Sequence, residues 1–234
     1  MIKVDYGDIK LQAKTIKQEV SKLLTKLWEN RSLGLQRLVP GMIFCVPMQL
    51  LEIDFQNIEL GEFSILGLEL PVSVSCLDRY ENAALNKYRD SWILRWRVLE
   101  DFREESCYSH LEEYREEEVD ISCPRALHRW LLRKDGSRNV GRKVTGIGFY
   151  TPYKQLAKVF RNFLVNGLPI IFWPKHSLNA ADIDRLRTLL KVFPSQPLST
   201  FMDFRIASNH DDAGPVSVLL DNPYLPPPDS EVDY

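Results

Sequence analysis

Apolar residues near the start of the chain recur at three- and four-residue steps between Ile9 and Asn30 and are interleaved with lysines. This spacing predicts an amphipathic helix with one buried face. Two later apolar runs, 41–47 and 70–77, are bounded by Gly, Pro or turn residues and predict strands. The segment between them, 48–56, fits one short helix.

Residues 91–99, with the sequence SWILRWRVL, fit two periods. Alternation of large apolar residues with Arg95 and Arg97 favours a strand with one solvated face. Trp92, Trp96 and Leu99 also share a helical face, so a helix is the alternative. Both interpretations stay open at this point.

The second half of the chain alternates between strand and helix patterns. Asn166-Gly167 can end the first of two helices, because glycine readily takes the left-handed conformation, and Asn179 can cap the second. The order is a strand at 146–150, a helix at 156–164, a strand at 168–173, a helix from about Asn179 to Phe193, and strands at 204–208 and 216–221. This alternation predicts a single α/β domain with a mixed, partly parallel sheet flanked by helices.

The predicted domain organisation has three parts. Residues 1–38 form an N-terminal helical segment packing on the core, 39–228 form the α/β domain, and 229–234 form a tail. The prolines after the last strand fix φ and remove amide donors, so the chain should leave the sheet as an extended arm that is free for a partner. We expect Asp221 and Asn222 to hold this turn by accepting hydrogen bonds from the backbone or from a basic side chain such as Arg79.

Composition excludes some classes of partner. The chain has 234 residues, with 30 Lys and Arg against 32 Asp and Glu, so any attraction to nucleic acid or anionic lipid must be local. No stretch reaches the roughly 18 apolar residues of a membrane span, and the first residues resemble no signal peptide. We therefore expect a soluble cytoplasmic protein. Cys45, Cys76, Cys107 and Cys123 form no zinc-type cluster and are expected to be reduced and mostly buried.

Few local patterns point to catalysis. The segment 136–143 approaches a phosphate loop, but Arg142 stands where the motif needs Lys and Val144 ends the match. The sequence has no GxSxG nucleophile elbow, and the oxygen- and imidazole-rich segment 209–215 fits an ordinary strand connection. Asp78 and Asp221 could be ligands in a metal-dependent hydrolase or nuclease. The alternative for Asp78 is an ion pair with a nearby arginine, and we predict no metal and no cofactor.

Two blocks of opposite charge adjoin in the middle of the chain. Residues 101–120 carry nine acidic and two basic side chains, and residues 125–143 carry seven basic and one acidic. They fit solvated faces that neutralise each other across a helical pair, or a docking surface for a protein. Nucleic-acid binding through His128 and Trp130 is a third, weaker interpretation.

Four segments in order carry a family resemblance. They are IFCVPMQLLEIDF (43–55), LGLELPVSVSCLDR (66–79), NGLPIIFWPK (166–175) and VSVLLDNPYLPPP (216–228). Together they resemble the C-terminal domain of the bacterial vWA-MoxR-associated proteins, over roughly residues 20 to 230. The positions that match the family patterns include Asp78, Arg79, Trp173, Asp221, Asn222 and Pro223.

The resemblance implies a role in a multi-gene conflict or defence system of bacteria. In such systems a MoxR-type AAA+ ATPase and a von Willebrand factor A protein act with a third protein. That third protein joins an effector, such as a trypsin-like protease, to this domain, which is treated as a sensing or adaptor module without established catalytic residues. This chain shows no effector domain before its first helix, so we expect a stand-alone version or a domain of a longer protein.

The chain departs from the family patterns at four positions. Ser75, Lys175 and Leu225 stand where the family has arginines, and Leu220 stands where it has tryptophan. Lysine cannot reproduce the bidentate fork of arginine, so an anion site built from those arginines would be largely lost. We predict that Asp78, Arg79, Trp173, Lys175, Asp221, Asn222 and Pro223 serve structure or partner contact.

Overall fold

A computed structural model describes most of the chain. The described residues are 9–29, 41–51, 53–60, 64–101, 111–115, 118–136, 144–150, 156–175, 177–190 and 216–224. The predicted strand at 204–208, the segment 209–215, the loop 137–143, Cys107 and the arm from Leu225 onward lie outside them. The proposed domain limits at residues 38 and 228 fall outside them too and stay a prediction.

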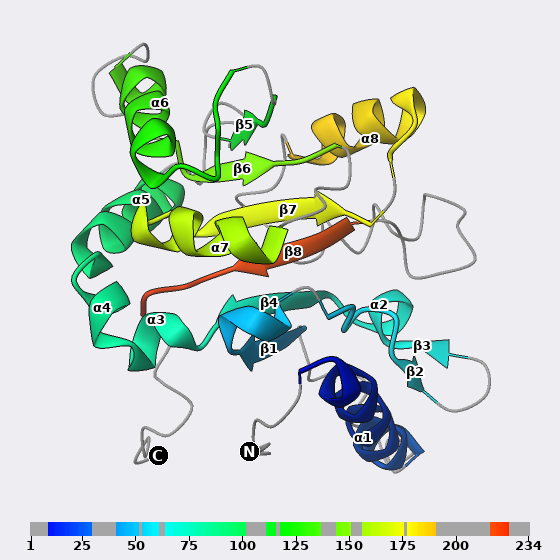
Figure 1. Cartoon of the computed structure of the whole chain (residues 1–234). Helices are drawn as coiled ribbons and strands as arrows, with labels where there is room; N and C mark the ends of the chain where they lie inside the picture. The colour runs from blue at the N-terminus through cyan, green and yellow to red at the C-terminus, as the bar shows by residue number, and fades with distance from the viewer. Residues whose placement is uncertain are drawn as a thin grey trace.

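A mixed sheet forms the centre of the fold (Figure 1). The strand order is β1 (Met42–Val46), β4 (Val72–Cys76), β8 (Val216–Leu220), β7 (Ile170–Pro174), β6 (Gly146–Gly148) and β5 (Leu111–Glu113). Neighbouring strands are parallel except at the β7 and β8 pair, where Ile171 faces Leu219 in antiparallel register. The prediction of an α/β domain with a partly parallel sheet is confirmed.

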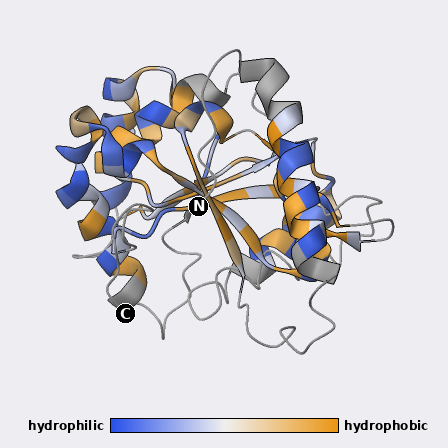
Figure 2. Ribbon diagram, turned by 90° about the horizontal axis from the view of Figure 1, so that it is seen from below, coloured by the Kyte–Doolittle hydropathy of each residue, from blue (hydrophilic) through white to orange (hydrophobic). Residues whose placement is uncertain are grey.

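Two hydrophobic clusters cover the two faces of the sheet. On β7, Ile171 and Trp173 belong to the cluster that contains α1 (Ile9–Glu29), α6 (Pro124–Gly136) and α7 (Leu156–Val165). Ile170 and Phe172 belong to the other cluster, with α5 (Arg89–Asp101) and α8 (Ala180–Leu190). Alternate side chains of a strand point to opposite faces, so helices lie on both sides of the sheet, as Figure 2 shows with its apolar strands between them. Every side chain of β4, β7 and β8 is buried.

The predicted N-terminal helix is confirmed as α1, whose Ile16 and Leu24 join the first cluster. The strand interpretation of 91–99 is wrong, because this segment lies within α5. Its buried residues Trp92, Arg95 and Val98 recur every three positions, whereas Leu94, inward on the strand pattern, is 45% exposed. The large and charged residues alternate as in a strand, but the buried positions recur at the spacing of a helix.

The segment 48–56 is not one helix. It contains a single 3-10 turn, η3 (Met48–Leu50). After this turn the Phe55 amide donates to the carbonyl of Ile53, only two positions earlier, whereas an α-helix joins residues four positions apart. Phe55 stacks on Phe44 of β1 with ring centroids 4.4 Å apart. The segment therefore packs over the edge of the sheet as a compact turn.

Several short elements have no clear sequence signal. A two-stranded hairpin of β2 (Glu59–Leu60) and β3 (Ser64–Ile65) precedes the short α2 (Leu66–Glu69). Two single-turn helices, α3 (Asp78–Glu81) and α4 (Ala83–Asn86), connect β4 to α5. Strand β5 lies inside the acidic block, where its glutamates gave no strand pattern. Among the described residues, no helix combines the length and apolar character needed to cross a membrane.

Two glycines permit close packing at sites where a side chain would not fit. A Cβ on Gly148 would lie 1.7 Å from the ring of Phe172, its partner across β6 and β7. Gly167 has φ +71 and ends α7 as predicted. A Cβ there would lie 2.7 Å from the carbonyl carbon of Ser91 and 2.8 Å from the amide nitrogen of Trp92. The predicted cap is present as well, since Oδ1 of Asn179 accepts from the Asp182 amide at 2.9 Å.

The substitution Gly167→Ala should lower the free energy of unfolding by about 2 kcal/mol, because it strains a left-handed residue and forces α5 away from the end of α7. Urea denaturation measures the change. Gly167→Asn is the informative companion, since asparagine tolerates this φ but still carries a Cβ. An equal loss of unfolding free energy in both variants assigns the effect to the overlap of the added Cβ with the backbone of α5. No loss of stability in either variant would contradict the close packing.

Candidate functional site

Asp221 directly follows β8 and is completely buried. Its Oδ2 lies 3.1 Å from Nε of Arg79, and its Oδ1 accepts hydrogen bonds from the Ser75 hydroxyl at 2.7 Å and the Cys76 amide at 2.8 Å. Its backbone is held too, because its amide donates to the Pro169 carbonyl at 2.9 Å. Asp221 thus connects β8 to β4, to α3 and to the chain that leads into β7.

Arg79 is the second half of this buried pair, with its side chain 3% exposed. Nη2 donates to the carbonyl of Leu168 at 2.6 Å, and the guanidinium lies 4.6 Å from the ring centroid of Trp92. The indole Nε1 of Trp92 donates to the Asp221 carbonyl at 2.9 Å. Trp92 therefore packs on the cation and also bonds to the residue that carries the anion.

Burial acts on both partners of the pair. It raises the pKa of the Asp221 carboxyl, while Arg79, the Ser75 hydroxyl and the Cys76 amide oppose the shift by stabilising the ionised form. Burial likewise lowers the pKa of the Arg79 guanidinium, and Asp221 opposes that shift. Each charge is therefore the main compensation for the other, and removing one leaves the second buried without an opposite charge.

Asp78 has a different role from its neighbour. Its Oδ2 accepts a hydrogen bond from the amide of Met48 at 2.6 Å, which fixes the start of η3 after β1. The expected ion pair between Asp78 and an arginine is absent from the ion pairs of the described residues; a backbone amide takes that place.

The turn after β8 is held as the sequence indicated. Oδ1 of Asn222 accepts from the amide of Tyr224 at 2.9 Å, and the Asn222 carbonyl accepts from the Tyr80 hydroxyl at 2.9 Å. The Tyr224 hydroxyl in turn accepts from Nε of Arg97 at 3.1 Å. Pro223 is buried between these contacts.

Trp173 and Lys175 do not join this group. Because β7 and β8 are antiparallel, the end of β7 lies at the opposite end of the sheet from Asp221. Trp173 is buried, with its ring edge-on to Phe160 at 5.1 Å. Lys175 forms an ion pair with Asp54 in the turn over β1. The structure thus separates the predicted residues into two groups.

The geometry does not support Asp78 and Asp221 as a pair of metal ligands. Asp221 has no exposed surface, and its two oxygens face Arg79, Ser75 and the Cys76 amide. A catalytic metal needs an open coordination position that substrate can reach. Within the described part of the chain, no group of three His, Cys, Asp or Glu side chains is placed to hold a metal ion.

The two charge blocks neutralise each other in part. Nζ of Lys134 lies 3.1 Å from carboxylate oxygens of both Glu112 and Glu118. Trp130 is 2% exposed, and its Nε1 donates to Glu118 at 3.2 Å, so its ring is not available to stack on a base. In the described part of the two blocks this neutralisation joins α6 to β5 and to the turn that follows β5, and not to a second helix.

No local pattern in the sequence indicates the contacts that complete the site. Ser75 and Asp221 are 146 positions apart, and Trp92 and Asp221 are 129 apart. Ser75 stood out only as a departure from the family patterns, and no pattern marked Trp92 or Tyr80 as a site residue. Asp78 and Arg79 are neighbours in sequence, and sequence alone did not indicate that only Arg79 is buried beside Asp221.

These observations define a mixed α/β domain with a buried ion pair at one end of its inner strands β4 and β8. Residues 5–223 match the family described as the vWA-MoxR associated protein C-terminal domain, and the chain therefore belongs to that family. No curated protein and no solved structure matches the chain. The four segments that carry the resemblance contain β1, β4, β8 and β7, which are neighbours in the sheet.

The substitution Asp221→Asn should lower the free energy of unfolding by about 3 kcal/mol or more, because it leaves the Arg79 cation buried without its partner. Urea denaturation followed by circular dichroism measures it. Asp184→Asn is a matched control on α8, since that side chain is 78% exposed and should change stability by less than about 0.5 kcal/mol. Equal midpoints for the two variants would contradict the importance of the pair.

The three described cysteines should differ in reactivity towards iodoacetamide, because the thiolate is the reactive form. Burial and the nearby Asp221 raise the pKa of the Cys76 thiol, and the same causes raise the pKa of Cys45 to about 11. Cys123 is exposed, so the expectation of mostly buried thiols holds for Cys76 but not for Cys123.

We expect modification at pH 8 in the order Cys123, then Cys45, with Cys76 protected until the protein is unfolded. Peptide mapping by mass spectrometry at these three positions gives the order. A parallel reaction in urea is the control and should remove the differences. Early modification of Cys76 in the folded protein would contradict its burial beside Asp221.

Proposed function

We propose that this chain is a non-enzymatic sensing or adaptor module of a bacterial conflict system. In this proposal it couples an effector, such as a trypsin-like protease, to a MoxR-type AAA+ ATPase and a von Willebrand factor A protein. Membership in the vWA-MoxR associated protein family supports the association with those two classes of partner. The coupling role and the nature of the effector are our inference.

The single observation that carries the adaptor role is the burial of the Arg79–Asp221 pair. Active sites are usually concave and reachable, with titratable groups facing a substrate. Here the charged residues that match the family patterns instead hold strands together. This arrangement supports a domain whose function lies in its outer surface, and it does not favour the metal-dependent hydrolase alternative.

We also propose a cytoplasmic location and the division into a helical segment at 1–38, the domain at 39–228 and a tail at 229–234. The MoxR-type partner requires ATP, which fits that location. In this division the prolines after Tyr224 would carry the tail away from the sheet, where a partner could bind it.

The proposal predicts a stable assembly. The chain, tagged and co-expressed with the MoxR-type ATPase and the von Willebrand A protein encoded beside it, should co-purify with at least one of them through size exclusion. The tag alone with the same two partners is the control. Failure of both partners to bind, or the absence of their genes from the neighbourhood, would contradict the adaptor role.

A complementary assay addresses the enzyme alternative. The purified chain should show no phosphodiesterase or peptidase turnover in the presence of Mg²⁺, Mn²⁺ or Zn²⁺. Turnover that disappears in the Asp78→Asn variant, while the fold measured by circular dichroism is kept, would overturn the non-enzymatic assignment.

A further inference from the structure

A hollow of about 450 Å³ lies beside α6, and neither Arg79 nor Asp221 lines it. Its lining comes from three parts of the chain: the start of α5 and the turn before it, the first two turns of α6, and the end of α7. Its volume falls within the range of about 300–1,000 Å³ that is usual for small-molecule sites. No part of the function proposed above uses this hollow.

The floor of the hollow is rigidly built around Asn166, which is 7% exposed. Its Nδ2 donates to the Asn162 carbonyl at 2.8 Å, and its Oδ1 lies 3.0 Å from Nδ1 of His128. Its carbonyl accepts from Nε of Arg95 at 3.2 Å. The next residue, Gly167, lies directly against the backbone of α5. The amide and carbonyl groups of Asn166 are therefore all held by protein partners.

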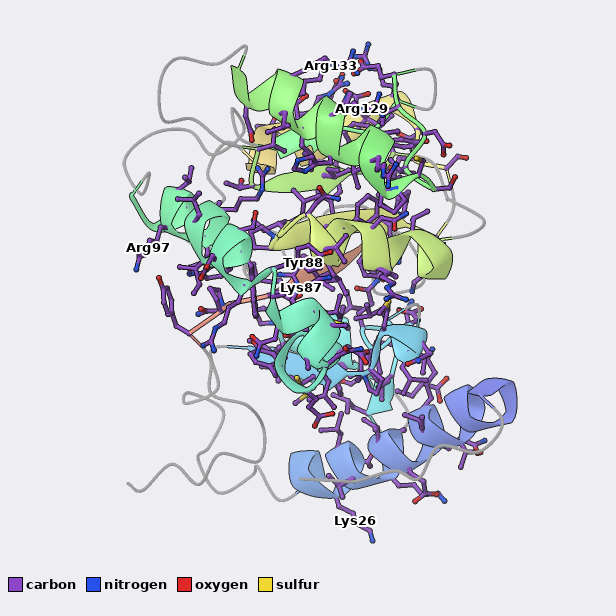
Figure 3. The ribbon with its side chains drawn as sticks, turned by 60° about the vertical axis from the view of Figure 1, so that its left-hand side comes forward. Lys26, Lys87, Tyr88, Arg97, Arg129 and Arg133 are labelled. Atoms are coloured by element: carbon purple, nitrogen blue, oxygen red, sulfur yellow. The ribbon has the colours of Figure 1, made fainter. Side chains whose placement is uncertain are left out.

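Positive charge faces this hollow without an opposing carboxylate in its lining. Arg95 is neutralised by Asp135 at 3.2 Å and also donates to the Val144 carbonyl. Arg125 and Arg129 are different: they lie one turn apart on α6 and are exposed. Figure 3 shows Arg129 on α6 and Lys87 beside Tyr88, on one side of the molecule. These cations give the hollow a net positive charge.

The hollow also has an apolar wall. Tyr88 is half-buried and lines it together with Pro124 and Val165. Nζ of Lys87 lies 4.9 Å from the Tyr88 ring centroid, which brings one more cation to this wall. An aromatic ring next to arginine forks matches a ligand that carries both a planar ring and an anionic group.

We propose that this hollow binds a nucleotide. Arg125 and Arg129 bind the phosphate oxygens through their guanidinium forks, and the Tyr88 ring contacts the base, as aromatic side chains do in nucleic-acid sites. A compact hollow with an aromatic wall favours this ligand over an acidic peptide, which would need an extended groove. This proposal does not depend on the partner proteins, because binding is a property of the chain alone.

The test is isothermal titration calorimetry of the purified full chain with ADP, pyrophosphate and adenosine. We expect ADP to bind more tightly than either fragment, because it engages both the arginines and the ring. The affinity should fall as salt is raised, since phosphate contacts are screened. Binding of adenosine as tight as that of ADP, or no binding of ADP at millimolar concentration, would overturn the proposal.

Variants locate the site. The double variant R125Q/R129Q should weaken ADP binding by about tenfold or more, as expected for the loss of charge-assisted hydrogen bonds. The matched control K26Q/R133Q removes the same charge, one residue from α1 and one from α6, and neither residue lines this hollow (Figure 3). It should change the affinity less than about twofold. Equal losses in the two double variants would overturn the site.

Two further arms complete the design. Tyr88→Leu should weaken ADP binding while leaving pyrophosphate binding unchanged, and equal weakening of both would overturn the contact with the base. A single-stranded oligoadenylate is titrated in parallel. If it binds through Arg125 and Arg129 more tightly than ADP does, the ligand is a nucleic-acid strand and the free-nucleotide proposal is overturned. Circular dichroism melting of each variant verifies that the fold is kept.

Discussion

The arrangement of the sheet depends on the ion pair between Arg79 and Asp221. Strand β8 comes last in the described chain, yet it lies between β4 and β7 in the sheet. Two buried charges are stable only when their opposite charges and hydrogen-bond partners are aligned. Asp221 has the Arg79 cation 3.1 Å away and accepts hydrogen bonds from the Ser75 hydroxyl and the Cys76 amide. A slip of β8 by one residue would move Asp221 away from all three, so we infer that the pair fixes the register of this strand.

The four segments that resemble the family describe this same region. They contain β1, β4, β8 and β7, and among the departures Ser75 contacts Asp221 directly. Ser75 donates its hydroxyl to Asp221. Lys175 is paired with Asp54, and Leu220 packs in the second hydrophobic cluster. All three side chains therefore have structural contacts within or beside the sheet.

Periodicity predicted the strands and helices wherever one pattern was dominant. It failed at α5, where large apolar residues alternate with Arg95 and Arg97 as in a strand while the buried residues recur at a helical spacing. It missed β5 because its glutamates are solvated or paired. The sequence did predict that Asp221 and Asn222 accept hydrogen bonds in the turn after the last strand, and that Asp221 contacts Arg79. The contacts to Trp92, Leu168 and Pro169 could not, since they join positions that only the folded sheet brings together.

The buried pair and the hollow beside α6 are connected through a short stretch of chain. Residues 166–169 line the floor of the hollow at one end and hold the ion pair at the other, where Leu168 accepts from Arg79 and Pro169 from Asp221. Helix α5 makes the same connection, because Arg95 bonds to the Asn166 carbonyl and Trp92 to that of Asp221. Asn166, which lines the hollow, is therefore only two or three positions in sequence from Leu168 and Pro169, which contact the ion pair. The hollow and the ion pair therefore share two packing elements, α5 and the chain at 166–169.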